Sequence, residues 1–303
     1  MIYKDLINFH AMQKINPQSF IVKEPVQLNK VPTRLEEEAD KEEKKKALNE
    51  VSKKLSKMQD TLYAHNRYGV LVCLQGMDTS GKDSLIREVF SHFNPRGVVV
   101  HSFKTPSHRE LQHDYLWRHY LALPEKGKYS IFNRSHYENL LVTRVNQQFL
   151  LNERIPGIQK VEDIPEGFWE QRYDQINNFE KHISQNGTII FKFFLHLSKE
   201  EQRRRLLRRL DKKEKIWKFT PSDISERELW DDYQLCYQKA INNTSSPHAP
   251  WYLIPADDKR MARYIVAQII HEEMSKYTDI QEPAPAKAVQ DNLEEYRRKL
   301  MEG

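Results

Sequence analysis

The stretch Val70-Leu-Val-Cys-Leu-Gln-Gly-Met-Asp-Thr-Ser-Gly-Lys-Asp-Ser84 decides how the rest of the sequence is interpreted. It opens with an apolar run rich in β-branched side chains, which is typical of a buried strand. Two glycines and a lysine follow at the spacing Gly76-x-x-x-x-Gly81-Lys82, and residues 83–90 have the pattern of a helix. A strand, a glycine loop and a helix in this order predict a phosphate-binding loop, which we prefer to a chance match on a strand-to-helix turn.

The predicted loop would bind phosphate through its backbone N–H groups, the N-terminus of the following helix and the ammonium group of Lys82. Asp78 inside the loop is unusual, and so is Asp83, which stands where a Ser or Thr usually holds Mg²⁺. A carboxylate beside phosphates needs a cation or a proton, so Asp78 is predicted to be a metal ligand or a base. The alternative for Asp78 is a capping hydrogen bond within the loop. The residues expected to line the phosphate site are Gly76, Met77, Thr79, Ser80, Gly81, Asp83 and Ser84.

The length and composition predict one large α/β domain with helical additions. The chain has 303 residues, of which 39% are hydrophobic, and this is sufficient for a core. Its two cysteines, Cys73 and Cys236, lie far apart without a metal-binding spacing, so they are expected to be reduced thiols of a cytosolic protein. The sequence has no apolar run of about 18 residues and no signal peptide, so we expect a soluble, cytoplasmic protein without a membrane partner.

Positive charge is concentrated in residues 203–218. This segment has nine Lys or Arg and two acidic residues, whereas the net charge of the whole chain is +5. Such a local excess is expected for a polyanionic ligand, and a solvated helix face is the alternative. Leu206, Leu207 and Leu210 would give the segment one apolar face. Its place after the fourth predicted strand is where P-loop kinases have a lid.

The remaining sequence predicts a doubly wound parallel sheet sandwiched by helices. An N-terminal arm and long helix take residues 1–66, the P-loop domain takes 67–277 with a lid at about 200–225, and a linker and C-terminal helix take 278–303. The other four strands are expected at residues 97–103, 129–133, 188–195 and 251–256, and the strand at 97–103 is expected to be buried. The second helix of the lid is expected at 225–241, and the terminal helix at 289–301.

The long N-terminal helix is expected over Arg34–His65. Thr33 would be its N-cap, with Glu36 at the capping-box position. An apolar stripe in its second half would pack on the core or on a partner chain, so together with the C-terminal helix it is compatible with a homodimer or homotetramer.

Polar residues follow the strand predicted at 129–133, namely Asn133, Arg134 and Glu138. In a doubly wound sheet the ligand binds beyond the C-terminal ends of the strands. We therefore expect these three side chains to lie beside the phosphate-binding loop. A simple turn with helix caps is the alternative for Asn133 and Arg134.

Several segments of the sequence resemble the polyphosphate kinase 2 family. They are Gly76-Met-Asp-Thr-Ser-Gly-Lys-Asp83, Phe132-Asn-Arg-Ser-His-Tyr-Glu138, Arg208-Arg-Leu-Asp-Lys-Lys-Glu-Lys-Ile-Trp-Lys-Phe219, Ala249-Pro-Trp-Tyr-Leu-Ile-Pro-Ala-Asp-Asp258 and Asp114-Tyr-Leu-Trp-Arg118. The resemblance implies a thymidylate-kinase-like P-loop core with a helical lid. It also implies transfer of phosphate between inorganic polyphosphate and nucleotides, with Mg²⁺, or Mn²⁺ in its place, as the cofactor.

The resemblance implies roles for individual residues as well. Asp78 would lie near the metal and the transferred group, and Lys82, Asn133 and Arg134 would be further catalytic residues. Many family members have Asp at the position of Asn133, and asparagine there resembles the class III subgroup, which phosphorylates both mono- and diphosphates. Arg204, Arg208, Arg209 and Lys218 match lid positions expected to bind polyphosphate, and Asp114, Arg118 and Glu138 are expected to bind the nucleotide.

Two other functions stay open on the sequence. One is an ATP-dependent nucleoside monophosphate kinase of the same fold, and the other is a non-catalytic module that binds nucleic acid or another polyanion through residues 203–218. The second is disfavoured because this segment lacks a set of aromatic residues, interleaved with the basic ones, for stacking on bases. The expected ligands are therefore polyphosphate with AMP, ADP and ATP, and guanine nucleotides as further acceptors, but not nucleic acid.

Overall fold

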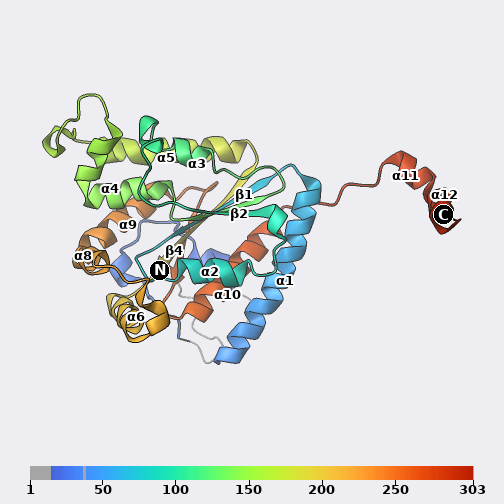
Figure 1. The fold of residues 1–303 in the computed structure, drawn as a ribbon, viewed down its shortest axis with the longest axis horizontal. Coiled ribbons are helices and arrows are strands. Elements are labelled where there is room, and N and C mark those ends of the chain that lie inside the picture. The colour runs from blue at the N-terminus through green and yellow to red at the C-terminus, as the bar shows by residue number, and fades with distance from the viewer. Residues whose placement is uncertain (1–14, 37–38, 303) are drawn as a thin grey trace.

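The computed structural model describes residues 15–36 and 39–302. A parallel sheet of five strands in the order β2-β3-β1-β4-β5 lies at its centre (Figure 1). The strands are β1 (Gly69–Gln75), β2 (Val98–Ser102), β3 (Tyr129–Asn133), β4 (Thr188–His196) and β5 (Trp251–Pro255). The predicted α/β fold with a five-stranded parallel sheet between helices is confirmed, and the strands lie where the sequence placed them.

Helices cover both faces of the sheet (Figure 1). On one face α1 (Lys41–His65), α2 (Lys82–Val89) and α10 (Lys259–Met274) pack together, and on the other lie α5 (Phe168–Gln185) and α9 (Trp230–Thr244). The short helices α3 (Trp117–Tyr120) and α4 (Val142–Val145) are on the side of α5. The 3-10 helices are η2 (Pro17–Phe20), η3 (Leu28–Lys30), η4 (Pro95–Gly97), η5 (Glu110–Gln112), η6 (His136–Leu140), η7 (Gln147–Glu153) and η8 (Val161–Asp163).

Strand β1 connects two hydrophobic cores, one on each face of the sheet. Val70, Val72 and Leu74 belong to the core beneath α1, α2 and α10, whereas Leu71 and Cys73 belong to a core on the opposite face. Successive side chains of a strand point to opposite faces, so a strand that is apolar throughout must be covered on both. This is why β1, which precedes the phosphate-binding loop, is buried along its whole length.

The prediction that the strand at residues 97–103 is buried was wrong. Val99 and Val100 are 45% and 47% exposed. The apolar run indicated burial, but β2 is the edge of the sheet and is paired with β3 on one side. An edge strand has a neighbour on one side, which leaves room for solvent at its outer side chains.

The start of the long N-terminal helix was also predicted wrongly. Asp40, not Thr33, is the N-cap of α1, and its side chain accepts hydrogen bonds from the backbone N–H groups of Glu42 and Glu43. Glu43 completes the capping box by accepting from the N–H of Asp40. Thr33 instead donates its hydroxyl hydrogen bond to Asp257 at 2.8 Å, and so it ties the N-terminal arm to the loop after β5.

The segment after β4 consists of more helices than were predicted. It folds into α6 (Lys199–Asp211), α7 (Lys213–Ile216) and α8 (Ser222–Glu228), and then continues into α9. The single helix expected over residues 225–241 is therefore two helices, α8 and α9, which Leu229 separates. The chain ends in α11 (Lys287–Asp291) and α12 (Leu293–Glu302), which lie away from the sheet in Figure 1.

Helix α6 does not have the apolar face that the sequence predicted. Leu206 is buried, but Leu207 and Leu210 are 46% and 43% exposed. The buried side of α6 consists of Gln202, Arg205 and Leu206. Polar contacts therefore replace two of the three expected leucines where α6 meets the rest of the protein.

Residues 1–14 of the predicted N-terminal arm lie outside the described residues. Across residues 15–36 and 39–302, no helix combines the length and the apolar character that crossing a bilayer would need.

Candidate functional site

The loop between β1 and α2 has a backbone that its glycines make possible. Gly76 and Gly81 have φ angles of 148° and 114°, in a region that favours glycine. A Cβ atom at Gly76 would lie 2.9 Å from the carbonyl oxygen of Leu195, so the close approach of the loop to β4 requires glycine at this position. The Gly76-x-x-x-x-Gly81 spacing thus produces the tight strand-to-helix loop that the sequence predicted.

Lys82 is the first residue of α2, and its side chain is folded over the loop. Its Nζ donates hydrogen bonds to the carbonyl oxygens of Gly76 at 2.6 Å and Met77 at 3.5 Å. Burial, and after it the charge of Arg134, lower the pKa of Lys82 to about 8, while nearby carboxylates oppose this shift. Because burial disfavours the ammonium form, an anion bound in the loop would stabilise the charged lysine.

Arg134 joins two of the carboxylates predicted for the site. Its Nη2 donates to Oδ1 of Asp78 at 2.7 Å, and its Nη1 donates to Oε2 of Glu138 at 3.1 Å. The charges of Glu138 and Asp78 raise the pKa of Arg134 against the opposing effect of burial. Arg134 also has a positive φ of 63°, a conformation that is uncommon outside glycine and concentrated at functional sites. The predicted position of Arg134 and Glu138 beside the loop is confirmed.

Asn133 connects the end of β3 to the first turn of α2. Its side-chain amide donates to Oδ1 of Asp83 at 2.7 Å. The hydroxyl of Ser84 donates a hydrogen bond to the carbonyl oxygen of Gly81 at 2.9 Å, so its partner lies within the loop itself. The predicted neighbours Asp83 and Asn133 therefore lie in contact, and an amide rather than a second carboxylate faces Asp83.

The carboxylates at this site suit a magnesium ion that is bound mainly by substrate phosphates. Asp78 and Asp83 each have one side-chain partner described above, Arg134 and Asn133. Among the residues that the structure describes, no three His, Cys, Asp or Glu side chains are grouped to hold a metal ion. Mg²⁺ usually takes one or two carboxylates and completes its shell with water and phosphate oxygens. Asp78, whose carboxylate lies within the loop in contact with Arg134, fits that requirement.

The four basic lid residues lie in different surroundings. Arg204 has a side chain that is 61% exposed, and Arg208 is exposed one turn further along α6. Arg209 is more enclosed, because its side chain is 24% exposed and its Nη1 lies 3.4 Å from the carbonyl oxygen of Lys218. Arg204, Arg208 and Lys218 are thus the exposed members of this set, and Arg209 is the partly enclosed one.

The predicted nucleotide residues do not all face the same space. Arg118 donates to the carbonyl oxygen of Lys104 at 2.8 Å and is close enough to Glu138 for that carboxylate to affect its pKa, which burial lowers. Asp114 accepts a hydrogen bond from the backbone N–H of Leu116 at 2.8 Å and lines a separate cavity of about 920 Å³. Arg118 is therefore brought to the site with Glu138, whereas Asp114 is not shown to contact either residue.

Lys259 is a site residue that the sequence analysis did not identify. It begins α10, and its Cε lies 3.7 Å from the place of a Cβ atom on Gly81. Burial, followed by the charges of Arg205, Arg263 and Arg208, lowers its pKa to about 8. A second lysine, which is half-buried, thus lies against the loop. The polar run directly after the fifth predicted strand was the available indication, because the C-terminal ends of parallel strands meet at one edge.

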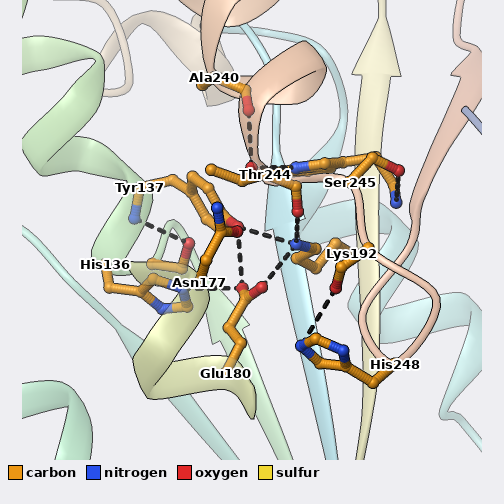
Figure 2. A network of polar contacts seen from close by, with 12 residues as sticks. His136, Tyr137, Asn177, Glu180, Lys192, Ala240, Thr244, Ser245 and His248 are labelled. Atoms are coloured by element: carbon orange, nitrogen blue, oxygen red, sulfur yellow. Dashed lines mark hydrogen bonds and ion pairs between the residues drawn. The ribbon is translucent and has the colours of Figure 1, made fainter. Parts of the chain in front are cut away.

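A buried polar network fixes the segment that carries Glu138. Figure 2 shows Glu180 of α5, Lys192 of β4 and Tyr137 of η6 joined to one another. The Lys192 Nζ lies 2.6 Å from Glu180 Oε2 and 2.9 Å from the Tyr137 hydroxyl, which donates to Glu180 Oε1 at 2.8 Å. Removing one partner of such a buried pair leaves an uncompensated charge, which is costly. Because Tyr137 is bonded to both Glu180 and Lys192, this network anchors η6 to α5 and β4.

A central parallel sheet, a glycine loop after β1 and a helical segment with exposed arginines after β4 together define a P-loop kinase. Comparison with known proteins identifies the family. The family model described as "Polyphosphate kinase 2 (PPK2)" matches residues 38–283, and the chain belongs to this family. The chain is accordingly a phosphotransferase, as the resemblance of its motifs implied.

Two relatives and a solved structure agree with this assignment. The chain is 48% identical over 264 residues to the ADP-polyphosphate phosphotransferase of Rhodopseudomonas palustris. The aligned region covers 86% of this chain and 90% of the relative. It is 44% identical over 251 residues to the AMP/ADP-polyphosphate phosphotransferase of Meiothermus ruber, covering 83% and 88%. The crystal structure of Polyphosphate Kinase 2 from Arthrobacter aurescens TC1 superposes with a TM-score of 0.86 at 30% identity, covering 97% of this chain and 99% of the other.

Proposed function

We propose that this chain transfers phosphate groups between inorganic polyphosphate and adenine nucleotides, converting AMP to ADP and ADP to ATP. One observation carries the proposal: Lys82 covers the loop while Arg134, in contact with Asp78 and Glu138, lies beside it. The names of the relatives, which act on AMP or ADP with polyphosphate, support the same choice of substrates.

The roles of the residues follow from the charge that develops during transfer. Phosphoryl transfer requires mainly positioning and neutralisation of phosphate charge. In this proposal Lys82 and the loop N–H groups hold the transferred phosphate, and Arg134 orients the oxygen that receives it. Arg204 and Arg208, which are exposed on α6, bind the following phosphates of the donor.

Asp78 is proposed to hold Mg²⁺, or Mn²⁺ in its place, against the phosphates. Its carboxylate is the one that lies within the loop, and its contact with Arg134 keeps it oriented. The metal, when bound, neutralises phosphate charge during transfer. Arg134 limits the negative charge that Asp78 presents to the substrate.

The acceptor range is proposed to include both mono- and diphosphates, with guanine nucleotides as further acceptors. Asn133 faces Asp83, and an aspartate at position 133 would place a second negative charge at this point of the site. Arg118, close to Glu138, is the proposed nucleotide contact. Asp114 lines a different cavity, so its proposed contact with the nucleotide is made from there.

The assembly and the location of the protein are further parts of the proposal. Leu293, Tyr296 and Leu300 are exposed on α12, which is compatible with a homodimer or homotetramer that light scattering would identify. Cys73 and Cys236 are free and buried, which suits a reducing cytoplasm. We expect no nucleic-acid binding, since Trp217 is the one aromatic residue in positions 199–218.

A turnover assay with two donors tests the proposed function. The purified chain is incubated with Mg²⁺, AMP or ADP, and either long-chain polyphosphate or ATP, and nucleotides are separated by chromatography. We expect ADP and ATP to form with polyphosphate, and no product with Lys82→Ala. Product from AMP with ATP but not with polyphosphate would identify a nucleoside monophosphate kinase instead. Polyphosphate binding without turnover on any acceptor would identify a binding module.

A further inference from the structure

Arg205 differs from the other arginines of the basic segment because it is buried. Its side chain is 4% exposed, whereas that of Arg204 beside it is 61% exposed. A guanidinium has five N–H groups. The first of these, on Nε, donates to Oε1 of Glu201 at 2.8 Å. Arg205 and Arg204 thus point to different sides of α6: Arg205 faces the protein, and Arg204 faces solvent.

The remaining N–H groups of Arg205 bond to backbone carbonyl oxygens on two separate segments. Nη1 donates to Thr79 at 3.0 Å and to Ser80 at 2.9 Å, both in the phosphate-binding loop. Nη2 donates to Ala256 at 2.6 Å and to Asp257 at 3.0 Å, directly after β5. One side chain thus connects α6, the loop and the segment that leads into α10.

Gln202, one turn before Arg205, adds a contact to the same loop. Its Nε2 donates to the carbonyl oxygen of Asp78 at 3.2 Å. The carbonyl groups of three consecutive residues, 78–80, therefore point toward α6. In a trans peptide the N–H of the next residue points the opposite way, so the N–H groups of Thr79 and Gly81 are directed away from α6. Backbone N–H groups of neighbouring residues can together form an anion-binding concavity.

We propose that Arg205, assisted by Gln202, is a positioning residue for phosphate transfer and not a ligand of polyphosphate. It orients the loop N–H groups by holding the carbonyl groups behind them. Through Ala256 and Asp257 it also fixes the start of α10, and with it Lys259 beside Gly81. The proposal rests on the proposed transfer reaction, but its structural part can be tested separately.

The test combines kinetics with hydrogen exchange in the loop. Arg205→Met is compared with Arg205→Lys, with Arg204→Met on the exposed face of α6, and with Arg96→Met, an exposed arginine outside α6 and the loop, as a control. For each variant we measure kcat, the KM for polyphosphate at two salt concentrations, and amide exchange in a peptide spanning residues 76–84. Misplacement of reacting groups by about 1 Å can cost about 100-fold in rate.

For Arg205→Met we expect kcat to fall by about 100-fold, with a KM and a salt dependence close to those of the wild type. Exchange in the loop should become faster, and Arg205→Lys should give a smaller loss because it keeps some of the contacts. Arg204→Met should raise the KM for polyphosphate and weaken its dependence on salt while kcat changes little. Arg96→Met should resemble the wild type in all measurements.

Two results would overturn the proposal. If Arg205→Met raises KM and weakens the salt dependence as Arg204→Met does, Arg205 is a polyphosphate ligand. If neither kcat nor loop exchange changes in Arg205→Met, Arg205 does not position the loop. Should Arg205→Met fail to fold, Gln202→Leu, which loses one loop contact, must lower kcat and speed loop exchange. An inactive wild type would refute the proposed function, and loop exchange in the variants would still decide whether Arg205 orients the loop.

Discussion

Replacing Lys82 by methionine should remove activity and yet stabilise the fold. The pKa of Lys82 is lowered from 10.5 to about 8, mainly by burial. A difference of about 2.5 pKa units corresponds to about 3 kcal/mol of cost for keeping the lysine charged in the folded protein. The variant loses the hydrogen bond from Nζ to Gly76, worth about 1–3 kcal/mol. We therefore expect a net gain of about 0–2 kcal/mol at pH 7.

The lowered pKa of Lys82 also predicts how the stability difference between the two proteins changes with pH. Below pH 8 lysine is charged in both states, so the cost of burying the charge is fully present in the wild type. Between pH 8 and 10.5 the unfolded state holds more protons than the folded state, so wild-type stability rises with pH. The advantage of the Lys82→Met variant over the wild type should shrink through this interval and be gone above it.

Thermal unfolding and kinetics of the same proteins test both parts. Melting temperatures are measured at pH 7, 8.5 and 10 without polyphosphate, and about 1 kcal/mol corresponds to about 2–4 °C for a chain somewhat shorter than this one. Activity should fall at least about 100-fold, because a stabiliser of transition-state charge is lost. Lys57→Met on the exposed side of α1 is the matched control and should change neither quantity. A Lys82→Met variant that melts several degrees below the wild type at pH 7, or near-normal turnover, would refute the reasoning.

Three further substitutions test other parts of the site. Asp78→Asn should lower kcat by about 10-fold or more while KM changes little, because its charge-assisted contact with Arg134 is weakened. A change in KM alone would show that Asp78 is a structural residue of the loop. Asn133→Asp should alter the ratio of the AMP and ADP rates, since its new charge faces Asp83; an unchanged ratio in parallel assays would count against the role given to Asn133. Neutralising Arg204 and Arg208 together should raise the KM for long polyphosphate more than the KM for ADP, and should make the KM for polyphosphate depend less on salt. Equal effects on both substrates would show that these arginines are only a solvated surface.

The features that local chemistry decides were predictable from the sequence. The glycine spacing of the loop follows from a backbone conformation that few other residues adopt, so Gly76 and Gly81 located it without any tertiary information. The position of Arg134 beside the loop, where it contacts Asp78, was predictable from a general property of parallel sheets, whose strand ends meet at one edge; the contact itself was not predicted.

Tertiary contacts decided the features that were predicted wrongly. Thr33 and Asp40 both precede a glutamate at the capping-box spacing, and the bond of Thr33 to Asp257 determined which of them caps α1. In the basic segment, helical phase alone could not tell which arginine faces the protein. The loop carbonyl groups that receive Arg205 come from residues more than a hundred positions earlier.

The central place of β1 has a consequence for synthesis of the chain. Its neighbours in the sheet are β3 and β4, and Gly69 pairs with Thr188. About 120 residues separate the end of β1 from the end of β4, and a ribosome that adds about 5–20 residues per second needs roughly 6 to 24 seconds to make them. During that time the apolar residues of β1 have no complete sheet to enter. We therefore expect the nascent segment that later precedes the phosphate-binding loop to bind a chaperone during this time.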